Sequence, residues 1–150
     1  MYYFAYGSNL SKKQMEQRCP DSKVYQVALL KNFQLEFPRF SQKIKCGVAS
    51  ILPANGSDVW GVIYNISGPD LISINKYEGV AFKCYYPEIV QLELNNGSNV
   101  SALTYIAFRE SDFVPPSDEY TKLIVEGAKD FKLPEEYIVK IQSIAKGGKK

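Results

Sequence analysis

The chain has 150 residues, of which 45% are hydrophobic and 23% charged, and its formal net charge is +2. These values are typical of one globular domain with a sizeable core, and the nearly balanced, scattered charge argues against nucleic-acid binding. Histidine is absent, which excludes Ser-His-Asp and Cys-His nucleophile schemes and leaves proton transfer to a carboxylate, tyrosine, lysine or cysteine.

The first third of the chain predicts a strand, a helix and two further strand segments. Tyr2–Tyr6 is a short apolar strand, and Ser11 is placed to cap a helix over about Lys12–Arg18. Val24–Leu30 and Phe33–Phe37 follow as strand segments, and the proline directly after them argues against a central strand beyond that point.

The middle of the chain predicts a hairpin and a helix. Gly47–Leu52 and Val59–Ile66 are rich in β-forming residues, and the Pro-Ala-Asn-Gly sequence between them is typical of a hairpin turn. A short helix is expected over about Pro69–Glu78, with proline in its first turn and Gly79 just past its end.

The last third predicts a second hairpin and two helices. Tyr85–Leu94 and Asn99–Phe108 are strands joined across an Asn-Asn-Gly-Ser turn. One helix is expected from the Ser117 cap to about Phe131, and another over Pro134–Ala145. About six strands before two terminal helices predict an α+β fold: a small closed or strongly curled mixed sheet, barrel-like and flanked by helices, with two helices at the C-terminus.

Residues 1–145 are expected to form a single domain, and the basic residues 146–150 a flexible tail. The N-terminus does not resemble a secretory signal, and no apolar stretch is long enough for a membrane-spanning helix. Cys19, Cys46 and Cys84 are odd in number and widely spaced, so neither a disulfide framework nor a zinc site is indicated. A cytoplasmic location without a membrane partner is expected.

Gly-Ser-Asn after the first strand is the first candidate site. In the segment Tyr6–Leu10, Gly7 permits close backbone approach, Asn9 tolerates a left-handed conformation, and a tight turn exposes main-chain N–H groups. Such donors, next to a helix N-terminus, can bind a carboxylate or a developing oxyanion. The alternative is a simple turn between strand and helix.

Glu78 is the second candidate. It lies on the same stripe of its predicted helix as Leu71 and Ile74, on the face that should pack against the sheet. Burial and the C-terminal helix dipole both disfavour a negative charge there, so we expect a raised pKa suited to general acid–base catalysis. The alternative is that the last turn frays and Glu78 reaches solvent.

Tyr85, Tyr105 and Tyr120 are candidates for half-buried hydroxyls that donate to a substrate, although any one of them alone is better explained as core. Cys84, beside Tyr85, has no local basic neighbour and is better explained as a small buried side chain.

Several segments together resemble the γ-glutamylcyclotransferase family. They are Tyr6–Leu10 (YGSNL), Val59–Val62 (VWGV), Glu78–Val80 (EGV), Tyr85, and the C-terminal stretch PPSDEYTKLIVEGAKDFKLPEEYIVKI. The resemblance covers nearly the whole chain. It departs from the family pattern at Asn75, where the family commonly has aspartate, so a second carboxylate near the site is in doubt.

The resemblance implies a barrel-like fold with one pocket, and release of 5-oxoproline from γ-glutamyl amino acids or dipeptides without metal or cofactor, in glutathione metabolism. It implies that Glu78 is the catalytic acid–base and that the main chain of Tyr6, Gly7, Ser8, Asn9 and Leu10 holds the glutamyl moiety. Tyr85, Tyr105 and Tyr120 match aromatic positions around the pocket.

Three alternatives stay open at this point. The chain could be a non-catalytic ligand-binding or interaction domain on the same fold, a cyclotransferase for γ-glutamylamines, or a thiol-dependent enzyme that uses Cys84 or Cys46. The oligomeric state is also open, and a homodimer is one option by analogy.

Overall fold

The computed structural model describes residues 1–148, which form five strands, four α-helices and two short 3-10 helices. The strands are β1 (Tyr2–Ala5), β2 (Lys23–Ser41), β3 (Cys46–Asn65), β4 (Tyr85–Glu93) and β5 (Asn99–Ala107). The helices are η1 (Ser8–Leu10), α1 (Lys12–Arg18), α2 (Gly68–Tyr77), η2 (Val80–Phe82), α3 (Asp118–Asp130) and α4 (Glu135–Ala145).

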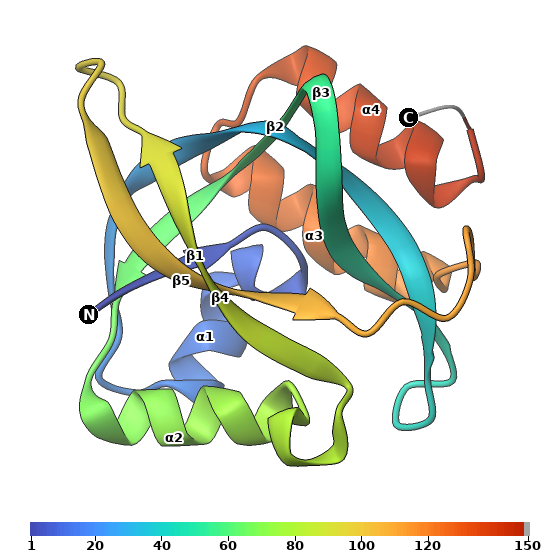
Figure 1. Cartoon of the computed structure of the whole chain (residues 1–150), viewed down its shortest axis with the longest axis horizontal. Helices are drawn as coiled ribbons and strands as arrows, with labels where there is room; N and C mark the ends of the chain where they lie inside the picture. Colours follow the sequence, from blue (N-terminus) through green and yellow to red (C-terminus); the bar gives the residue numbers. More distant parts are fainter. Residues whose placement is uncertain (149–150) are drawn as a thin grey trace.

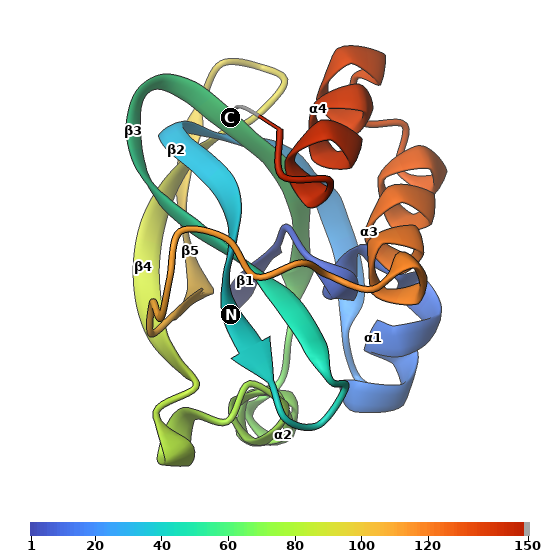
Figure 2. The same cartoon turned by 90° about the vertical axis from the view of Figure 1, so that its right-hand side faces the viewer.

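The strands close into a barrel in the order β1-β3-β2-β4-β5. β1 completes it, because it pairs antiparallel with β3 and parallel with β5. α3 and α4 lie along one side of the barrel, and α2 lies across one end (Figures 1 and 2). Fully buried side chains from strands and helices, such as Phe4, Phe37 and Ile141, form the core. The predicted α+β fold with a closed mixed barrel is confirmed.

The predicted hairpin between Gly47–Leu52 and Val59–Ile66 is wrong, because both segments belong to the single strand β3. β3 pairs along almost its whole length with the equally long β2, and the register shifts between Lys31 and Phe33. Asn32 and Gly56 have positive φ there, and the Asn32 Oδ1 accepts the Gly56 N–H at 3.1 Å. The turn-forming residues therefore bend two paired strands without ending either one.

Pro38 lies inside β2, which continues to Ser41 beyond the predicted segment Phe33–Phe37. Past this proline β2 pairs with β3 alone in the described chain, so the expectation that no central strand continues there is confirmed. The register against β3 shifts between Glu36 and Arg39. The Pro38 carbonyl accepts the Glu110 and Ser111 N–H groups at 2.9 and 3.1 Å. A proline has no N–H to donate, and a bulge is where a strand tolerates it.

The hairpin of β4 and β5 is confirmed, with Glu93 paired to Asn99 across the turn. The four α-helices lie within a residue or two of their predicted positions; α2 ends at Tyr77, and Glu78 is its C-cap. Lys146, Gly147 and Gly148 hydrogen-bond back to the end of α4, and residues 149–150 of the expected tail lie outside the described residues.

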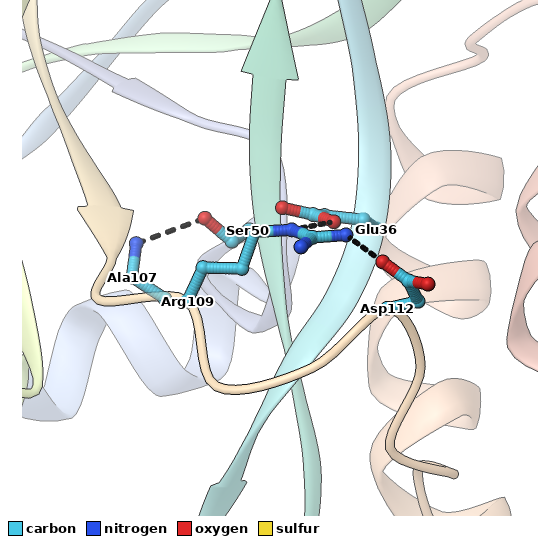
Figure 3. Close-up of polar contacts among 5 residues, drawn as sticks. All are labelled: Glu36, Ser50, Ala107, Arg109 and Asp112. Carbon is cyan, nitrogen blue, oxygen red and sulfur yellow. Dashed lines mark hydrogen bonds and ion pairs between the residues drawn. The ribbon is translucent and has the colours of Figure 1, made fainter.

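Side chains connect the end of β5 to β2 and β3, where no strand ladder joins them (Figure 3). The Ser50 hydroxyl accepts the Ala107 N–H at 2.8 Å. Arg109 lies between two carboxylates, with its Nε 3.1 Å from Glu36 and a terminal nitrogen 2.6 Å from Asp112. Because Glu36 is only 2% exposed, the Arg109 guanidinium neutralises a charge that would otherwise be costly to bury.

α3 packs directly on the turn that follows β1. A Cβ added to Gly127 would lie 2.6 Å from the carbonyl carbon and oxygen of Leu10, so only a glycine permits this approach. Leu10 is fully buried in the core. The contact fixes the N-terminal turn against the C-terminal half of the chain.

Gly127→Val should destabilise the protein by about 2 kcal/mol or more, since the new side chain meets backbone that has no room to move away. Gly68→Val is the matched control, because a Cβ at Gly68 meets nothing within 4 Å. Urea unfolding of both variants tests the contact, and equal losses of stability would show that the α3–η1 approach is not close.

Candidate active site

A pocket of about 380 Å³ opens at the end of the barrel where α2 terminates. Its lining includes Tyr6, Gly7, Ser8, Asn9, Glu78, Tyr85, Tyr105 and Tyr120. The structure therefore brings together every predicted site residue except Leu10, whose side chain lies in the core against α3. Leu10 supports the turn from behind and does not line the pocket.

Local sequence places Glu78 at the pocket. Ser67 and Asp70 form a capping box that starts α2, and the Glu78 N–H closes the helix by donating to the Ile74 carbonyl at 2.9 Å. Gly79 then takes φ +63°, the left-handed conformation that ends helices, and a Cβ there would lie 2.9 Å from the Cys84 sulfur. The Glu-Gly pair thus ends the helix and turns the chain so that the glutamate lines the cavity.

The Glu78 carboxylate is desolvated and lacks a close partner. Among residues 1–148, no side chain or main-chain group forms a hydrogen bond or an ion pair with this carboxylate. Burial raises the pKa of Glu78 to about 7, and the charge of Arg18 opposes that rise. Glu78 can therefore exchange a proton near neutral pH, as a general acid–base must.

A second cavity, of about 580 Å³, contains the carboxylate of Glu36, which is buried, whereas Glu78 is partly buried. In the second cavity the acid is already paired with Arg109 (Figure 3). Within the described residues, Glu78 has no such cation bound to it, and its pKa is raised toward neutrality. The electrostatics therefore single out the cavity at Glu78 as the candidate active site.

The turn after β1 offers main-chain donors to this cavity. Its own hydrogen bonds use the N–H groups of Leu10 and Ser11, each 3.0 Å from its acceptor. In the described chain the N–H groups of Gly7, Ser8 and Asn9 donate to no protein acceptor. Three consecutive free amides of residues that line the pocket can bind an anionic oxygen.

Asn9 contributes through its side chain and does not use the left-handed backbone conformation that an asparagine tolerates. It lies in η1 and has no positive φ, and its side chain is buried. The amide donates to the Tyr3 hydroxyl at 2.9 Å and accepts from Gln14 at 2.9 Å and from Arg18 at 3.2 Å. Asn9 is thus a hydrogen-bond hub that connects β1, the turn and α1.

Two site tyrosines are oriented by one residue of β3. Tyr85 donates its hydroxyl to the Ala49 carbonyl at 2.6 Å, and the Tyr120 hydroxyl accepts the Ala49 N–H at 3.1 Å. Tyr105 is fixed by its hydrogen bond to the Asn75 side chain, and Tyr6 donates to the Tyr105 carbonyl at 2.5 Å. Asn75, the departure from the family pattern, therefore positions a pocket tyrosine.

These hydroxyls stay protonated. Burial is the main cause that raises the pKa of Tyr6, Tyr85, Tyr105 and Tyr120, and the Glu78 carboxylate raises each further. The tyrosines are consequently hydrogen-bond donors in this pocket, and Glu78 is the group whose pKa is moved toward neutrality.

Sequence reasoning missed Tyr3, Arg18 and the connection between β2 and β3, all of which line the pocket. Tyr3 lies on a strand that is apolar on both faces, so alternation gave no signal for it. Arg18 is a basic residue in the last turn of α1, a position that the helix dipole alone explains. Only the folded chain brings them to the cavity.

Within the described residues no three or more of the Cys, Asp and Glu side chains gather in a way that could hold a metal ion. No helix in that part of the chain has the length and apolar character needed to cross a membrane.

Comparison with known proteins shows the family to which this chain belongs. The sequence model of the AIG2-like family matches residues 58–141. The γ-glutamylcyclotransferase of Bos taurus is 37% identical over 146 residues, which are 95% of this chain and 77% of that protein. The Homo sapiens γ-glutamylcyclotransferase is 34% identical over the same shares.

A solved structure named γ-glutamyl cyclotransferase superposes with a TM-score of 0.90 at 33% identity, covering 96% of this chain and 87% of that one. A human structure titled as an uncharacterized protein gives a TM-score of 0.88 at 35% identity, over 95% of this chain and 86% of that one. The chain belongs to the γ-glutamylcyclotransferase family.

The raised pKa of Glu78 makes stability depend on pH. The unfolded chain ionises near the usual value of 4.5 and the folded protein at about 7, so the free energy of unfolding falls as the pH rises between these values. Glu78→Gln removes this loss, and we expect the variant to be about 2–3 kcal/mol more stable than the parent at about pH 8. The gain should vanish at about pH 4.

Urea unfolding of both proteins at the two pH values measures this difference. A variant that gains the same stability at both would show that the Glu78 carboxylate is not desolvated in the folded state.

Proposed function

We propose that this protein is a γ-glutamylcyclotransferase, which converts γ-glutamyl amino acids or dipeptides to 5-oxoproline and a free amine-bearing product. The observation that carries the proposal is Glu78, a carboxylate with a pKa raised to about 7 in a cavity beside free main-chain amides. The names of relatives at 33–37% identity support the same activity.

The reaction is an attack of the substrate's α-amine on its own γ-carbonyl carbon. The new C–N bond closes a five-membered lactam, and the bond to the leaving nitrogen breaks. Two protons leave the α-nitrogen and two reach the leaving nitrogen, so atoms and charge balance without a cofactor. Because nucleophile and carbonyl belong to one molecule, the enzyme needs chiefly to fold the substrate and move these protons.

Glu78 is the proposed proton carrier. An ammonium cannot attack, and with no histidine in the chain a carboxylate whose pKa is about 7 is the available base. Its ionised form removes a proton from the α-nitrogen, and its protonated form then donates to the leaving nitrogen. The rise in pKa caused by burial is what allows both steps at neutral pH.

The free N–H groups of Gly7, Ser8 and Asn9 are proposed to bind the glutamyl carboxylate or the oxyanion of the tetrahedral intermediate. The Tyr120 hydroxyl accepts from Ala49, so its own proton can be donated to the substrate. The Tyr85 and Tyr105 hydroxyls donate their protons to Ala49 and Asn75. We propose that the rings and hydroxyl lone pairs of these two tyrosines contact the glutamyl chain of the substrate.

The proposed site residues all belong to one chain, within the single domain that we propose for residues 1–145, so the mechanism needs no second copy. A cytoplasmic setting remains part of the proposal and is supported by three free cysteines. The product would place the enzyme in the turnover of γ-glutamyl compounds, glutathione among them.

Glu78→Gln should lower kcat by at least about 100-fold, because the side chain keeps its size and loses its proton exchange. The assay is release of 5-oxoproline from γ-glutamyl-alanine by the purified protein. Glu88→Gln, at an exposed site on β4 outside this pocket, is the matched control and should retain the parent's rate.

A Glu78→Gln variant that keeps most of its turnover would overturn the assignment of Glu78. No 5-oxoproline from the parent protein with any γ-glutamyl substrate would overturn the proposed function itself, and leave a ligand-binding domain on the same fold.

Gly7→Val tests the turn. A Cβ at this residue would lie 3.4 Å from the Ala49 Cβ and 3.9 Å from the Tyr120 hydroxyl, which is ordinary contact distance, so the fold should tolerate it. The valine methyl groups would occupy pocket space, and we expect kcat/KM to fall by about tenfold or more while thermal stability changes little. Unchanged kinetics would mean that the turn only joins β1 to α1.

A further inference from the structure

The Tyr3 side chain belongs to the wall of the active-site pocket. Tyr3 lies on β1, lines the pocket and is only 4% exposed. Its ring packs against two other tyrosine rings, with ring centres 6.0 Å from that of Tyr105 and 6.5 Å from that of Tyr64. Packing therefore fixes the ring, and hydrogen bonding decides where the hydroxyl proton points.

Arg18 fixes the direction of the hydrogen bond between Asn9 and Tyr3. A guanidinium can only donate, so the Asn9 atom that lies 3.2 Å from Arg18 is the carbonyl oxygen. The amide nitrogen of Asn9 is then the atom 2.9 Å from the Tyr3 hydroxyl, and an amide nitrogen can only donate. Tyr3 therefore accepts this hydrogen bond, and its own proton is left for another acceptor.

The protein itself supplies no acceptor for that proton. Among residues 1–148, the Tyr3 hydroxyl forms no hydrogen bond other than the one that it accepts from Asn9. Tyr85 and Tyr105 differ, because their hydroxyls donate to other groups of the protein. A buried hydroxyl needs a partner, and Tyr3 can find one in the pocket that it lines.

Tyr3 is also close to Glu78. After burial, the charge of Glu78 is the largest cause that raises the pKa of Tyr3, so the two groups interact across the cavity. A hydroxyl that donated to Glu78 would stabilise the ionised carboxylate and weaken it as a base. No such bond forms within the described chain, so the Tyr3 proton stays available for a charge that appears during the reaction.

The negative charge in the pocket changes place when the substrate's α-amine attacks. Ionised Glu78 takes a proton from the attacking nitrogen and becomes neutral. The nitrogen lone pair forms the new C–N bond, and the π-electron pair of the γ-carbonyl group moves onto its oxygen. This oxygen is bonded to the carbon that carries both reacting nitrogens, so a donor close to Glu78 is well placed to reach it.

We propose that the Tyr3 hydroxyl, oriented by the Asn9 side chain, donates a hydrogen bond to the γ-carbonyl oxygen of the substrate as that oxygen becomes negative. The proposal rests on the proposed cyclotransferase activity and adds a side-chain donor to its mechanism. Burial holds the pKa of Tyr3 well above its ordinary value, so the hydroxyl keeps its proton throughout. Gln14 and Arg18 support Tyr3 from behind by fixing the amide of Asn9.

Tyr3→Phe removes the donor and keeps the ring. We expect kcat to fall by about 100-fold, the loss typical when one oxyanion donor is removed, while KM stays within about twofold of the parent's value. The assay is release of 5-oxoproline from γ-glutamyl-alanine. The pH dependence of kcat/KM should keep its shape, because Glu78 still carries the proton.

Tyr64→Phe is the matched control. Tyr64 pairs with Tyr3 between β3 and β1, and its ring packs against that of Tyr3. Its hydroxyl is buried, has no hydrogen-bond partner in the part of the chain that the structure describes, and does not line the pocket. The same phenolic oxygen is thus removed from the same core, and kcat should stay at the parent's value. Thermal unfolding of both variants confirms that folded protein is assayed.

Asn9→Asp tests the direction of the hydrogen bond with a side chain of the same shape. The aspartate can still accept from Gln14 and Arg18 but has no N–H, so the Tyr3 hydroxyl would donate to it and turn its proton away from the substrate. We expect kcat to fall by about tenfold or more in the parent, and by at least about fivefold less in the Tyr3→Phe protein, where the donor is already gone. The added charge acts on Glu78 in both backgrounds, so this comparison cancels it.

The outcomes separate the proposed function from the role of Tyr3. If the parent releases no 5-oxoproline, the proposed function fails. If the parent is active and Tyr3→Phe keeps a kcat within about threefold of that of Tyr64→Phe, the activity stands and the Tyr3 donor is overturned. A loss confined to KM, or a displaced pH profile, would overturn it too, since the hydroxyl would then bind the ground state or act through Glu78. Equal losses from Asn9→Asp in both backgrounds would overturn the orientation of Tyr3 by Asn9.

Discussion

Desolvation of one partly buried acidic side chain, Glu78, is the constraint on which this site depends. A carboxylate in a cavity without a hydrogen-bond partner destabilises the fold whenever it is ionised. Glu36 and Glu78 each line a cavity, and across the described residues Glu36 has a guanidinium bound to it whereas Glu78 has none. Arg18 acts on Glu78 from a distance and offsets part of the penalty. The pKa that results is the property that general acid–base chemistry at neutral pH requires.

The pocket's other polar groups obtain their geometry from places where the barrel is incomplete. β3 forms no ladder with β4 or β5 in the described chain, and at Ala49 its N–H and carbonyl are hydrogen-bonded to the Tyr120 and Tyr85 hydroxyls. Side-chain contacts such as Ser50 to Ala107 take over there from the strand ladder (Figure 3). In a fully hydrogen-bonded barrel the main-chain groups of Ala49 would already be paired, and the two hydroxyls would have no main-chain partner there. The gap in the strand ladder and the orientation of the tyrosines therefore depend on each other.

Much of the fold and most of the pocket could be predicted from the sequence, because local signals coincide with them. The cap at Ser67, the apolar stripe that ends in Glu78 and the following glycine describe α2 almost completely. The hairpin predicted at Asn55 and Gly56 is wrong because turn-forming residues can also bend a long strand without ending it. The contact with Asn32 on β2 distinguishes a bend from a hairpin turn, and it joins residues far apart in the sequence. Arg18 was missed for a similar reason, since contacts between distant segments leave no local pattern.

The position of β1 has a consequence for how the enzyme comes into being. This strand precedes the other four along the described chain, yet its partners are the far end of β3 and the middle of β5, some sixty to one hundred residues later. The three free amides follow it directly. Glu78 and this amide turn therefore come together only once β1 has paired with its distant partners, a closure that long sequence separation makes slow. The time at which turnover appears during refolding would therefore report when β1 closes the barrel.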